Sequence, residues 1–495
     1  MDTKKAIAVI LAALLFFLFL SCADGAKGDR PGGEADDKSP GGETGEEAKM
    51  GFDLLPAEDY GGAEFVIGNI EGWAWVDLTL EVEAEDAGEM ISDAIYRRNR
   101  IVEDKYNVSL KVIEIPYDQM VGKVRNQMMA GDCEYDLMQM AMQYTVAPLS
   151  VEGYIADANK LEKLDLTHPW WDDFAHACSS ILGKQFFLFG DFTIADKEYA
   201  NVVFFNKELQ QRYGLPDFYQ FVYDGSWTID KMNEMMKVAT VKLDASDKWT
   251  KKDQYGLVLN IHSKMGLFYG AGENLMKKDA NDVPYWVVDS ESFINAFNKM
   301  CEFLSSEHVG DAMGKLGSHQ DEMFADGKGL FDATLLAAIR APQGAQKGME
   351  YDFGILPSPK LNDAQERYYT FMDASTPCIS ILNNDQGRLD RACTVLEALN
   401  AKSSEEVQPK YKEYALPNKY FRDEQSFEML DIVLASRLFD MGVIYGWGNL
   451  DGNGGLLRNL LYNNQAAKLA STLESNLPKA VAAMEKDLAL LSNLP

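Results

Sequence analysis

The chain has 495 residues, of which 46% are hydrophobic and 11% aromatic, and its formal net charge at pH 7 is -30. This apolar content is enough for well-packed globular lobes, and a chain of this length is too long for one ordinary core. The strong negative charge argues against nucleic acid and against an anionic lipid surface as partners.

The N-terminus has the pattern of a secretory signal. Lys4 and Lys5 precede an uninterrupted apolar run, residues 6–20, which is followed by Ser21 and Cys22. A positive start, a short apolar core and a small residue before the cleavage site are typical of such a signal. Because it ends on a cysteine, it resembles a bacterial lipoprotein signal, and this resemblance implies lipidation of the Cys22 thiol. An uncleaved membrane anchor is the alternative, although the run is shorter than the roughly 20 residues that span a bilayer.

A polar segment follows the signal. Residues 23–49 contain Gly, Pro, Ala, charged and small polar residues, with no large apolar side chain. Such a segment cannot bury enough surface to offset the ordering of its backbone, so we expect a flexible tether. We therefore assign residues 1–21 to a signal peptide and residues 22–51 to a lipidated cysteine with its disordered linker.

The folded part begins with strands that alternate with helices. Strands are predicted at residues 63–68, 108–115 and 135–140. Helices with one apolar face are predicted at residues 91–106 and 117–129. This alternation indicates a parallel sheet with crossover connections.

A second α/β region and a helical C-terminal region complete the chain. Strands are predicted at residues 185–189, 199–206, 256–260, 351–356 and 378–382. Helices are predicted at residues 207–213, 225–240, 292–306, 320–325, 390–399, 427–441 and 465–491. Thr228 is the expected N-cap of its helix, and Trp227 is expected to pack that helix onto a sheet.

The cysteines and histidines predict neither a disulfide framework nor a metal site. Five cysteines beyond Cys22 are scattered without a CxxC motif, and a single buried disulfide stays an alternative. Cys301 and Cys393 lie in apolar runs and are predicted to be buried thiols. The five histidines have no HExxH spacing, which argues against a zinc hydrolase. We expect no metal and no cofactor.

Several short motifs occur in an order that resembles one protein family. FNKEL at residues 205–209 is followed by GLP at residues 214–216 and by Trp227, and FADGKGLFDA and YDFGILPSPK come later. This order resembles the extracellular solute-binding proteins of ABC importers, in particular the family with the maltose- and oligosaccharide-binding receptors. The resemblance extends from about residue 63 to the end of the chain.

The resemblance implies an α/β, two-lobed periplasmic-binding-protein-like fold with discontinuous lobes, hinge crossings and a helical C-terminal region. Lobe 1 is expected to comprise residues 52–192 plus 334–374, and lobe 2 residues 193–333 plus 375–495. The crossings are expected near residues 191–199, 331–333 and 373–376. Ligand would close the lobes about this hinge, and the permease would recognise the closed form.

Sugar pockets combine planar polar groups with aromatic rings, because sugars present both hydroxyl edges and apolar faces. We therefore look for ligand contacts after predicted strands, at the crossings and in a late Gly-rich loop. The candidates are Trp73, Trp75, Gln143, Tyr144, Asp191, Glu198, Tyr199, Asp332, Arg340, Asp373, Tyr445 and Trp447. Packing, or a solvated charge, is the alternative role of each.

The implied function is that of an extracytoplasmic substrate-binding lipoprotein of an ABC transporter. It would capture a sugar or oligosaccharide and deliver it to the transmembrane subunits of a permease, as a monomer without enzyme activity. Its place would be the extracytoplasmic face of the cell membrane, held there by the N-terminal lipid. Two alternatives stay open. One is a secreted carbohydrate-active hydrolase, which needs a pair of suitably spaced carboxylates; the other is a surface lipoprotein without a transport role.

Overall fold

The structure is a computed structural model that describes residues 51–71, 80, 90–339, 349, 351–415, 423–451 and 454–494. The described residues all belong to one compact unit, Met50–Pro495. The predicted signal peptide, Cys22 and nearly all of the predicted linker lie outside the described residues. The fold below is that of this unit.

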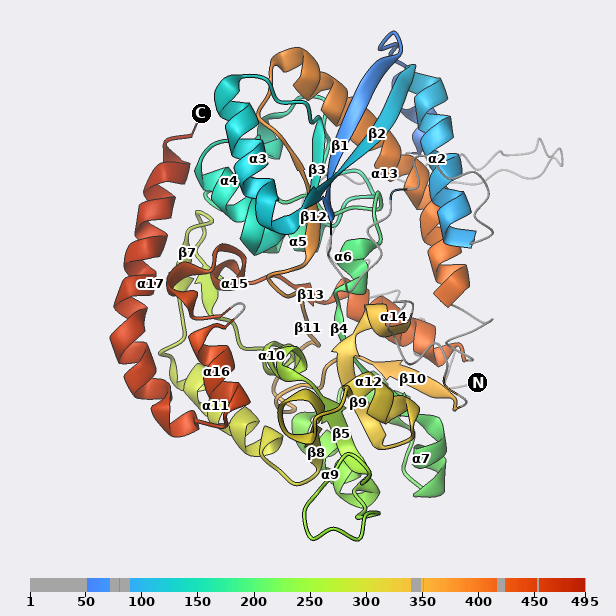
Figure 1. Ribbon diagram of the computed structural model, residues 1–495, viewed down its shortest axis with the longest axis vertical. Helices are drawn as coiled ribbons and strands as arrows, with labels where there is room; N and C mark the ends of the chain where they lie inside the picture. Colours follow the sequence, from blue (N-terminus) through green and yellow to red (C-terminus); the bar gives the residue numbers. More distant parts are fainter. Residues whose placement is uncertain are drawn as a thin grey trace, which may run out of the picture. The chain divides into compact units, whose positions relative to one another are not determined.

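The first sheet has four strands in the order β12-β3-β1-β2 (Figure 1). The strands are β1 (Ala63–Glu71), β2 (Val108–Pro116), β3 (Leu137–Ala141) and β12 (Pro377–Ile381). β1 pairs in parallel with β2 and β3, as the alternation predicted, while β12 is antiparallel to β3. The main helices of this part are α2 (Met90–Tyr106), α3 (Tyr117–Ala130) and α13 (Gln386–Ala415).

The second sheet has five strands in the order β10-β4-β9-β5-β8. They are β4 (Asn201–Asn206), β5 (Tyr255–Leu259), β8 (Val309–Asp311), β9 (Gly329–Leu335) and β10 (Phe353–Leu356). Its helices are α7 (Lys207–Arg212), α8 (Phe218–Tyr223), α9 (Ile229–Ala239), α10 (Ile261–Gly270), α11 (Glu291–Leu304) and α12 (Gln320–Ala325). The Thr228 side chain accepts a hydrogen bond from the Lys231 amide, which confirms it as the N-cap of α9.

Short elements and a helical C-terminal region join the two sheets. In Figure 1, α6 (Ala195–Glu198), β11 (Thr370–Phe371) and β13 (Arg437–Leu438) lie between them. The C-terminal helices are α14 (Gln425–Ala435), α15 (Met441–Tyr445), α16 (Leu456–Tyr462) and α17 (Leu469–Ser492). The remaining elements are η1 (Phe52–Leu54), η2 (Met142–Val146), α4 (Ala147–Val151), η3 (Ala158–Lys160), α5 (Asp173–Ser179), β6 (Met276–Lys278), β7 (Pro284–Trp286), η4 (Ala312–Leu316), η5 (Leu336–Ile339), η7 (Trp447–Asn449) and η8 (Ala466–Lys468).

Strand pairing corrects the sequence assignment in three places. β10 belongs to the second sheet because it pairs with β4, although residues 334–374 were expected in lobe 1. β12 belongs to the first sheet because it pairs with β3, although residues 375–495 were expected in lobe 2. Residues 331–333, expected at a crossing, lie inside β9, which pairs with β4 and β5 on its two sides. Residues 373–376, by contrast, do connect β11 to β12.

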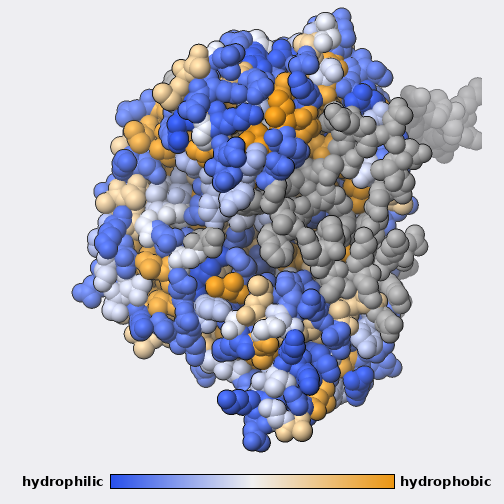
Figure 2. Space-filling view, viewed as in Figure 1, coloured by the Kyte–Doolittle hydropathy of each residue, from blue (hydrophilic) through white to orange (hydrophobic). Residues whose placement is uncertain are grey.

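The exterior shown in Figure 2 is mostly polar, and the described cysteines are free thiols. The face shown in Figure 2 is predominantly hydrophilic, with small scattered apolar areas. Cys301 and Cys393 are buried as predicted, and the five cysteines from Cys133 onward are free thiols. None of the described helices has both the length and the apolar character that a bilayer span requires.

Trp227 provides a test of the second lobe's packing. Its side chain is fully buried beside Phe218 and Phe331, and its indole Nε1 donates to the Pro357 carbonyl over 3.0 Å. We expect Trp227→Ala to lower the free energy of unfolding by about 3–5 kcal/mol, because it leaves a large cavity. Trp227→Phe should cost about 1–3 kcal/mol, because mainly the hydrogen bond is lost.

Urea unfolding followed by circular dichroism measures both changes. Trp249, which is only partly buried, is the matched control, and Trp249→Ala should cost clearly less than Trp227→Ala. Equal losses at the two tryptophans would contradict the packing role of Trp227.

Candidate ligand-binding site

The carboxyl ends of strands β3 and β5 begin the candidate site. In open α/β sheets, ligands bind outside the carboxyl ends of the strands. β3 ends at Ala141 and continues directly into η2, which carries Gln143 and Tyr144. β5 ends at Leu259, and Asn260 caps α10 by accepting hydrogen bonds from the amides of His262 and Ser263.

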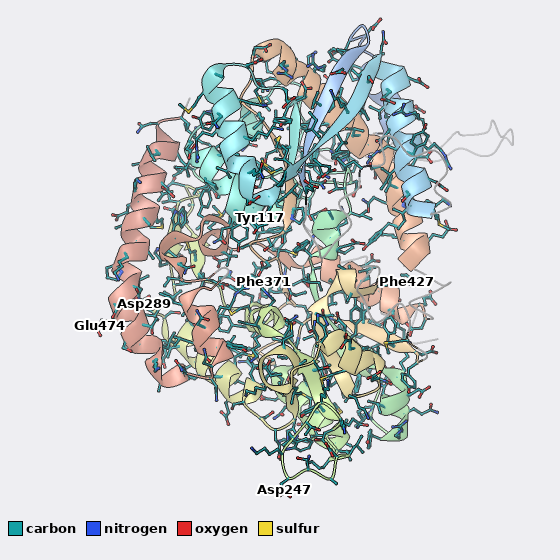
Figure 3. All side chains as sticks on the ribbon, viewed as in Figure 1. Tyr117, Asp247, Asp289, Phe371, Phe427 and Glu474 are labelled. Carbon is teal, nitrogen blue, oxygen red and sulfur yellow. The ribbon has the colours of Figure 1, made fainter. Side chains whose placement is uncertain are left out.

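Residues 371–376 contact the ends of both sheets. The Phe371 ring, labelled between the sheets in Figure 3, stacks on Tyr269 of α10 at 4.1 Å. The Asn201 side chain of β4 donates to the Phe371 carbonyl over 3.0 Å. On the other side, the amides of Met142 and Gln143 donate to the carbonyls of Thr376 and Ala374, each over 3.1 Å. We call residues 371–376 the link segment.

Asp373 of the link segment is part of a buried ion network. The Arg458 guanidinium lies 2.8 Å from Asp373 Oδ2 and 3.0 Å from Asp451 Oδ1. Its third nitrogen lies 2.9 Å from His262 Nδ1, and Tyr269 Oη donates to Asp451 over 2.9 Å. Burial alone would raise the pKa of Asp373, but the Arg458 guanidinium and the hydrogen bond from the Ser375 amide hold that pKa below its usual range. The carboxylate is therefore ionised at neutral pH.

The late Gly-rich loop reaches the same place. Tyr445 and Trp447 stack at 4.8 Å, and the Trp447 indole donates to Asp487 over 2.8 Å. Gly446 between them has a φ of 63°, and a Cβ there would lie 2.2 Å from Gln143 Nε2. The loop therefore needs glycine at this position, both for its backbone conformation and for the close approach of Gln143. Gln143, Asp373, Tyr445 and Trp447 are thus brought together.

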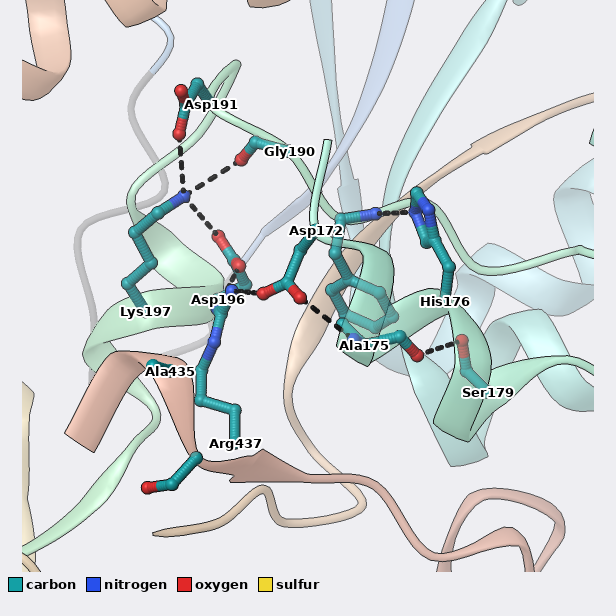
Figure 4. Close-up of polar contacts among 12 residues, drawn as sticks. Asp172, Ala175, His176, Ser179, Gly190, Asp191, Asp196, Lys197, Ala435 and Arg437 are labelled. Atoms are coloured by element: carbon teal, nitrogen blue, oxygen red, sulfur yellow. Dashed lines mark hydrogen bonds and ion pairs between the residues drawn. The ribbon is translucent and has the colours of Figure 1, made fainter. Parts of the chain in front are cut away.

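A second ion network holds the first crossing. The buried Arg437 guanidinium of β13 binds Asp196 over 2.6 Å and also contacts Asp172 (Figure 4). Lys197 lies 3.6 Å from Asp191 and donates to the Gly190 carbonyl over 2.9 Å. Burial lowers the Arg437 pKa less than the two carboxylates raise it, so the pKa is raised overall. Asp191 lies here, away from the Arg458 network.

The remaining predicted contacts are buried, half-buried or outside the described residues. Glu198 and Tyr199 are buried at the end of α6, and Asp332 is fully buried in the middle of β9 opposite Phe204. Tyr144 is half-buried against the main core. Trp73, Trp75 and Arg340 lie outside the described residues. A ligand contact by each of these remains a prediction.

Comparisons with known proteins relate part of the chain to one family. Residues 95–300 match the model of the bacterial extracellular solute-binding protein family. This confirms the family resemblance that the sequence motifs predicted. No curated protein sequence matches the chain.

Solved structures of solute-binding proteins confirm the two-lobed α/β fold. A cyclo/maltodextrin-binding protein complexed with maltotetraose is 13% identical, with a TM-score of 0.55 over 86% of this chain and 97% of that one. UspC of M. tuberculosis is 14% identical, with a TM-score of 0.55 over 85% and 100%. An ABC transporter solute-binding protein of Thermotoga lettingae bound with α-D-tagatose is 14% identical, with a TM-score of 0.51 over 87% and 100%. At these identities the likeness concerns the fold.

Sequence reasoning missed several residues of this solute-binding fold. His262 lies two residues after the predicted strand at residues 256–260, so the rule that selected Gln143 would also have selected it. Arg458 is a single charge in the apolar run LLRNLLY, a pattern that indicates a buried charge with a partner. Arg437 and Asp172 carry no such local signal, because they meet only through the tertiary fold.

The described residues of this solute-binding fold contain no group of three or more metal-ligating side chains. A small recess of about 220 Å³, including space open to solvent, adjoins Asp196 and is lined also by Trp171, Phe192, Cys378 and Asn400. This volume is below the range of about 300–1,000 Å³ typical of small-molecule pockets. This recess is therefore too small to be the candidate ligand site.

His176 of α5, beside the Arg437 network, should make stability depend on pH. Its Nε2 accepts a hydrogen bond from the Phe189 amide over 3.0 Å, so the folded protein favours the neutral ring. Burial lowers the His176 pKa from 6.5 to about 4. Because the unfolded chain binds the proton more readily, stability should fall as the pH drops from 6.5 towards 4, by roughly 3 kcal/mol.

Urea unfolding at several pH values measures this dependence. His176→Gln keeps an acceptor for the Phe189 amide but does not titrate, so its stability should fall less over the same pH range. A His176→Gln profile as steep as that of the unchanged protein would contradict the assignment.

Proposed function

We propose that this protein is the substrate-binding component of an ABC importer, which captures a sugar or oligosaccharide between its lobes and delivers it to a permease. The observation that carries the proposal is the link segment. It joins the carboxyl end of β3, the last turn of α10 and the Gly-rich aromatic loop in one polar and aromatic region. Amide, carboxylate and aromatic groups at strand ends are what a sugar pocket requires.

The charges of the site favour binding over hydrolysis. A glycosidase needs a carboxylic acid whose pKa is raised so that it can donate a proton. Here Asp373 and Asp451 both bind Arg458, and the pKa of Asp373 is lowered. These carboxylates are suited to orient neighbouring groups, so we infer a receptor without catalytic activity.

An anionic cargo is disfavoured because both arginines of the site are already bound by aspartates. Arg458 is shared between two aspartates, and Arg437 likewise. Two of the similar structures are complexes with maltotetraose and α-D-tagatose. These observations support a carbohydrate as the cargo class.

The N-terminal pattern supports the site of action. We infer that Cys22 is lipidated and that residues 23–49 tether a monomeric receptor to the extracytoplasmic face of the cell membrane. A tethered receptor stays near the permease while its lobes remain free to close on ligand.

Ligand screening tests the function. A sugar that binds the folded protein should stabilise it by about 2.7 kcal/mol at a concentration of 100 Kd, because the unfolded chain does not bind. Thermal unfolding against mono- and oligosaccharides measures the shift, and recovery of the intact sugar shows that it is not consumed. The absence of any shift with sugars or polyols would contradict the receptor, and release of new reducing ends would favour the hydrolase alternative.

Gln143 tests the location of the site. Its half-buried amide lies between the link segment and the Gly-rich loop, so Gln143→Ala should weaken sugar binding about 5- to 10-fold through loss of a hydrogen bond. Titration calorimetry measures the change. Gln127→Ala is the matched control, because Gln127 is a half-buried glutamine on α3 that bonds Glu134. Equal affinities of the two variants would place the site elsewhere.

A further inference from the structure

The tautomer of His262 follows from its neighbour. Its Nδ1 lies 2.9 Å from a terminal nitrogen of Arg458. A guanidinium has five N–H donors, no acceptor and a pKa too high to lose its proton in a protein. The Arg458 group must therefore donate, and Nδ1 must accept. The proton of the neutral imidazole then resides on Nε2.

The orientation of the Arg458 side chain is fixed by its other two partners. The residue is 3% exposed, and its Nε and second terminal nitrogen bind Asp451 and Asp373 over 3.0 and 2.8 Å. Asp451 is itself held by the Tyr269 hydroxyl over 2.9 Å. All three guanidinium nitrogens are thus directed at three different partners, which fixes the plane of the group.

The His262 imidazole is neutral, and the side of the ring that carries Nε2 is open to a ligand. Burial of one edge of the ring and the charge of Arg458 lower the His262 pKa, against the opposing effect of Asp373 and Asp451. His262 is nevertheless an exposed residue in the first turn of α10. Within the described part of the chain, no protein group pairs with Nε2. The structure therefore presents an N–H donor of fixed direction where β5 ends.

We propose that His262 contacts the ligand and donates its Nε2–H to an oxygen atom of an uncharged carbohydrate, with Arg458 as the positioning residue. This inference rests on the proposed function and deepens it, because it defines the chemistry the ligand must offer at this point. A hydroxyl, ring or glycosidic oxygen accepts the bond. An ammonium group offers no lone pair, so an amino sugar with its ammonium at this point cannot accept the bond.

Nitrogen NMR of the full protein labelled with 15N-histidine tests the donor directly. The chain has five histidines, and the signal missing from His262→Gln identifies the ring. We expect an unprotonated Nδ1 and a protonated Nε2 at neutral pH. A protonated Nδ1 would overturn the proposal, whether or not any sugar binds.

Affinity measurements test the contact. His262→Phe keeps a ring but removes the donor, and should weaken binding of a sugar found in the screen about 5- to 10-fold. His262→Gln restores an N–H donor and should recover part of that loss. The affinity of the unchanged protein should stay level between pH 8 and pH 6.5. Unchanged affinity in His262→Phe would overturn the contact.

The two tests separate this inference from the proposed function. If no sugar binds the unchanged protein, the proposed function fails and the sugar contact falls with it, while the NMR signal still decides the tautomer. If sugar binds but the NMR signal shows Nδ1–H, only this inference fails. His319→Phe is a matched control for aromatic substitution of a histidine, because His319 lies before α12 and is paired with Asp321.

Discussion

The buried guanidinium of Arg458 is the charge on which the arrangement of the site depends. Removing a cation from water costs several kcal/mol, and its attraction to carboxylates repays this only when the geometry is good and every donor is used. Arg458 places each of its three nitrogens on a partner, with Nε on Asp451 and the two terminal nitrogens on His262 and Asp373. These partners come from the link segment, the Gly-rich loop and α10, so one side chain holds three distant parts of the chain together.

A second buried arginine, Arg437, is bound by two aspartates in the same way near the first crossing, residues 191–199. It binds Asp172 before α5 and Asp196 in α6, and its own strand β13 pairs with β11. In each of these two ion networks an arginine therefore lies between two aspartates. Such a pairing fixes the direction of the arginine N–H donors and leaves no net positive charge. Apolar packing alone would fill the space but would not set the direction of the donors.

The sequence predicted the element types well because they depend on local patterns. The period of apolar residues marked α2, α3 and the strands β1–β3, and Thr228 was found as a cap from its residue type. Residues 185–189 were expected as a strand, but only Leu188 forms an isolated bridge, to Ile379. Sheet membership was harder. PCISI of β12 is fully buried and would read the same in either sheet, so only long-range pairing decides its place.

The site was predicted in part for the same reason. Gln143, Asp373 and Tyr445 follow strands or lie in a Gly-rich loop, and the fold brings them together as the rule of strand ends implies. Trp447 was chosen as an aromatic in a loop, but its ring is 3% exposed, which the sequence could not indicate. Asp332 was predicted at a crossing between the lobes, but strand pairing shows that it lies within the second sheet.

The late arrival of β12 has a consequence for how the chain folds. Cys378 of β12 bonds the carbonyl of Met140, which lies 238 positions earlier in the sequence. Until residues 377–381 arrive, β3 is an open edge with unpaired backbone groups, which is a site for wrong pairing. The second sheet has no such delay, because all its strands lie between residues 201 and 356. The second sheet can therefore form before β12 pairs with β3 in the first sheet. Because β12 and β3 are far apart in the sequence, their pairing is expected to be slow.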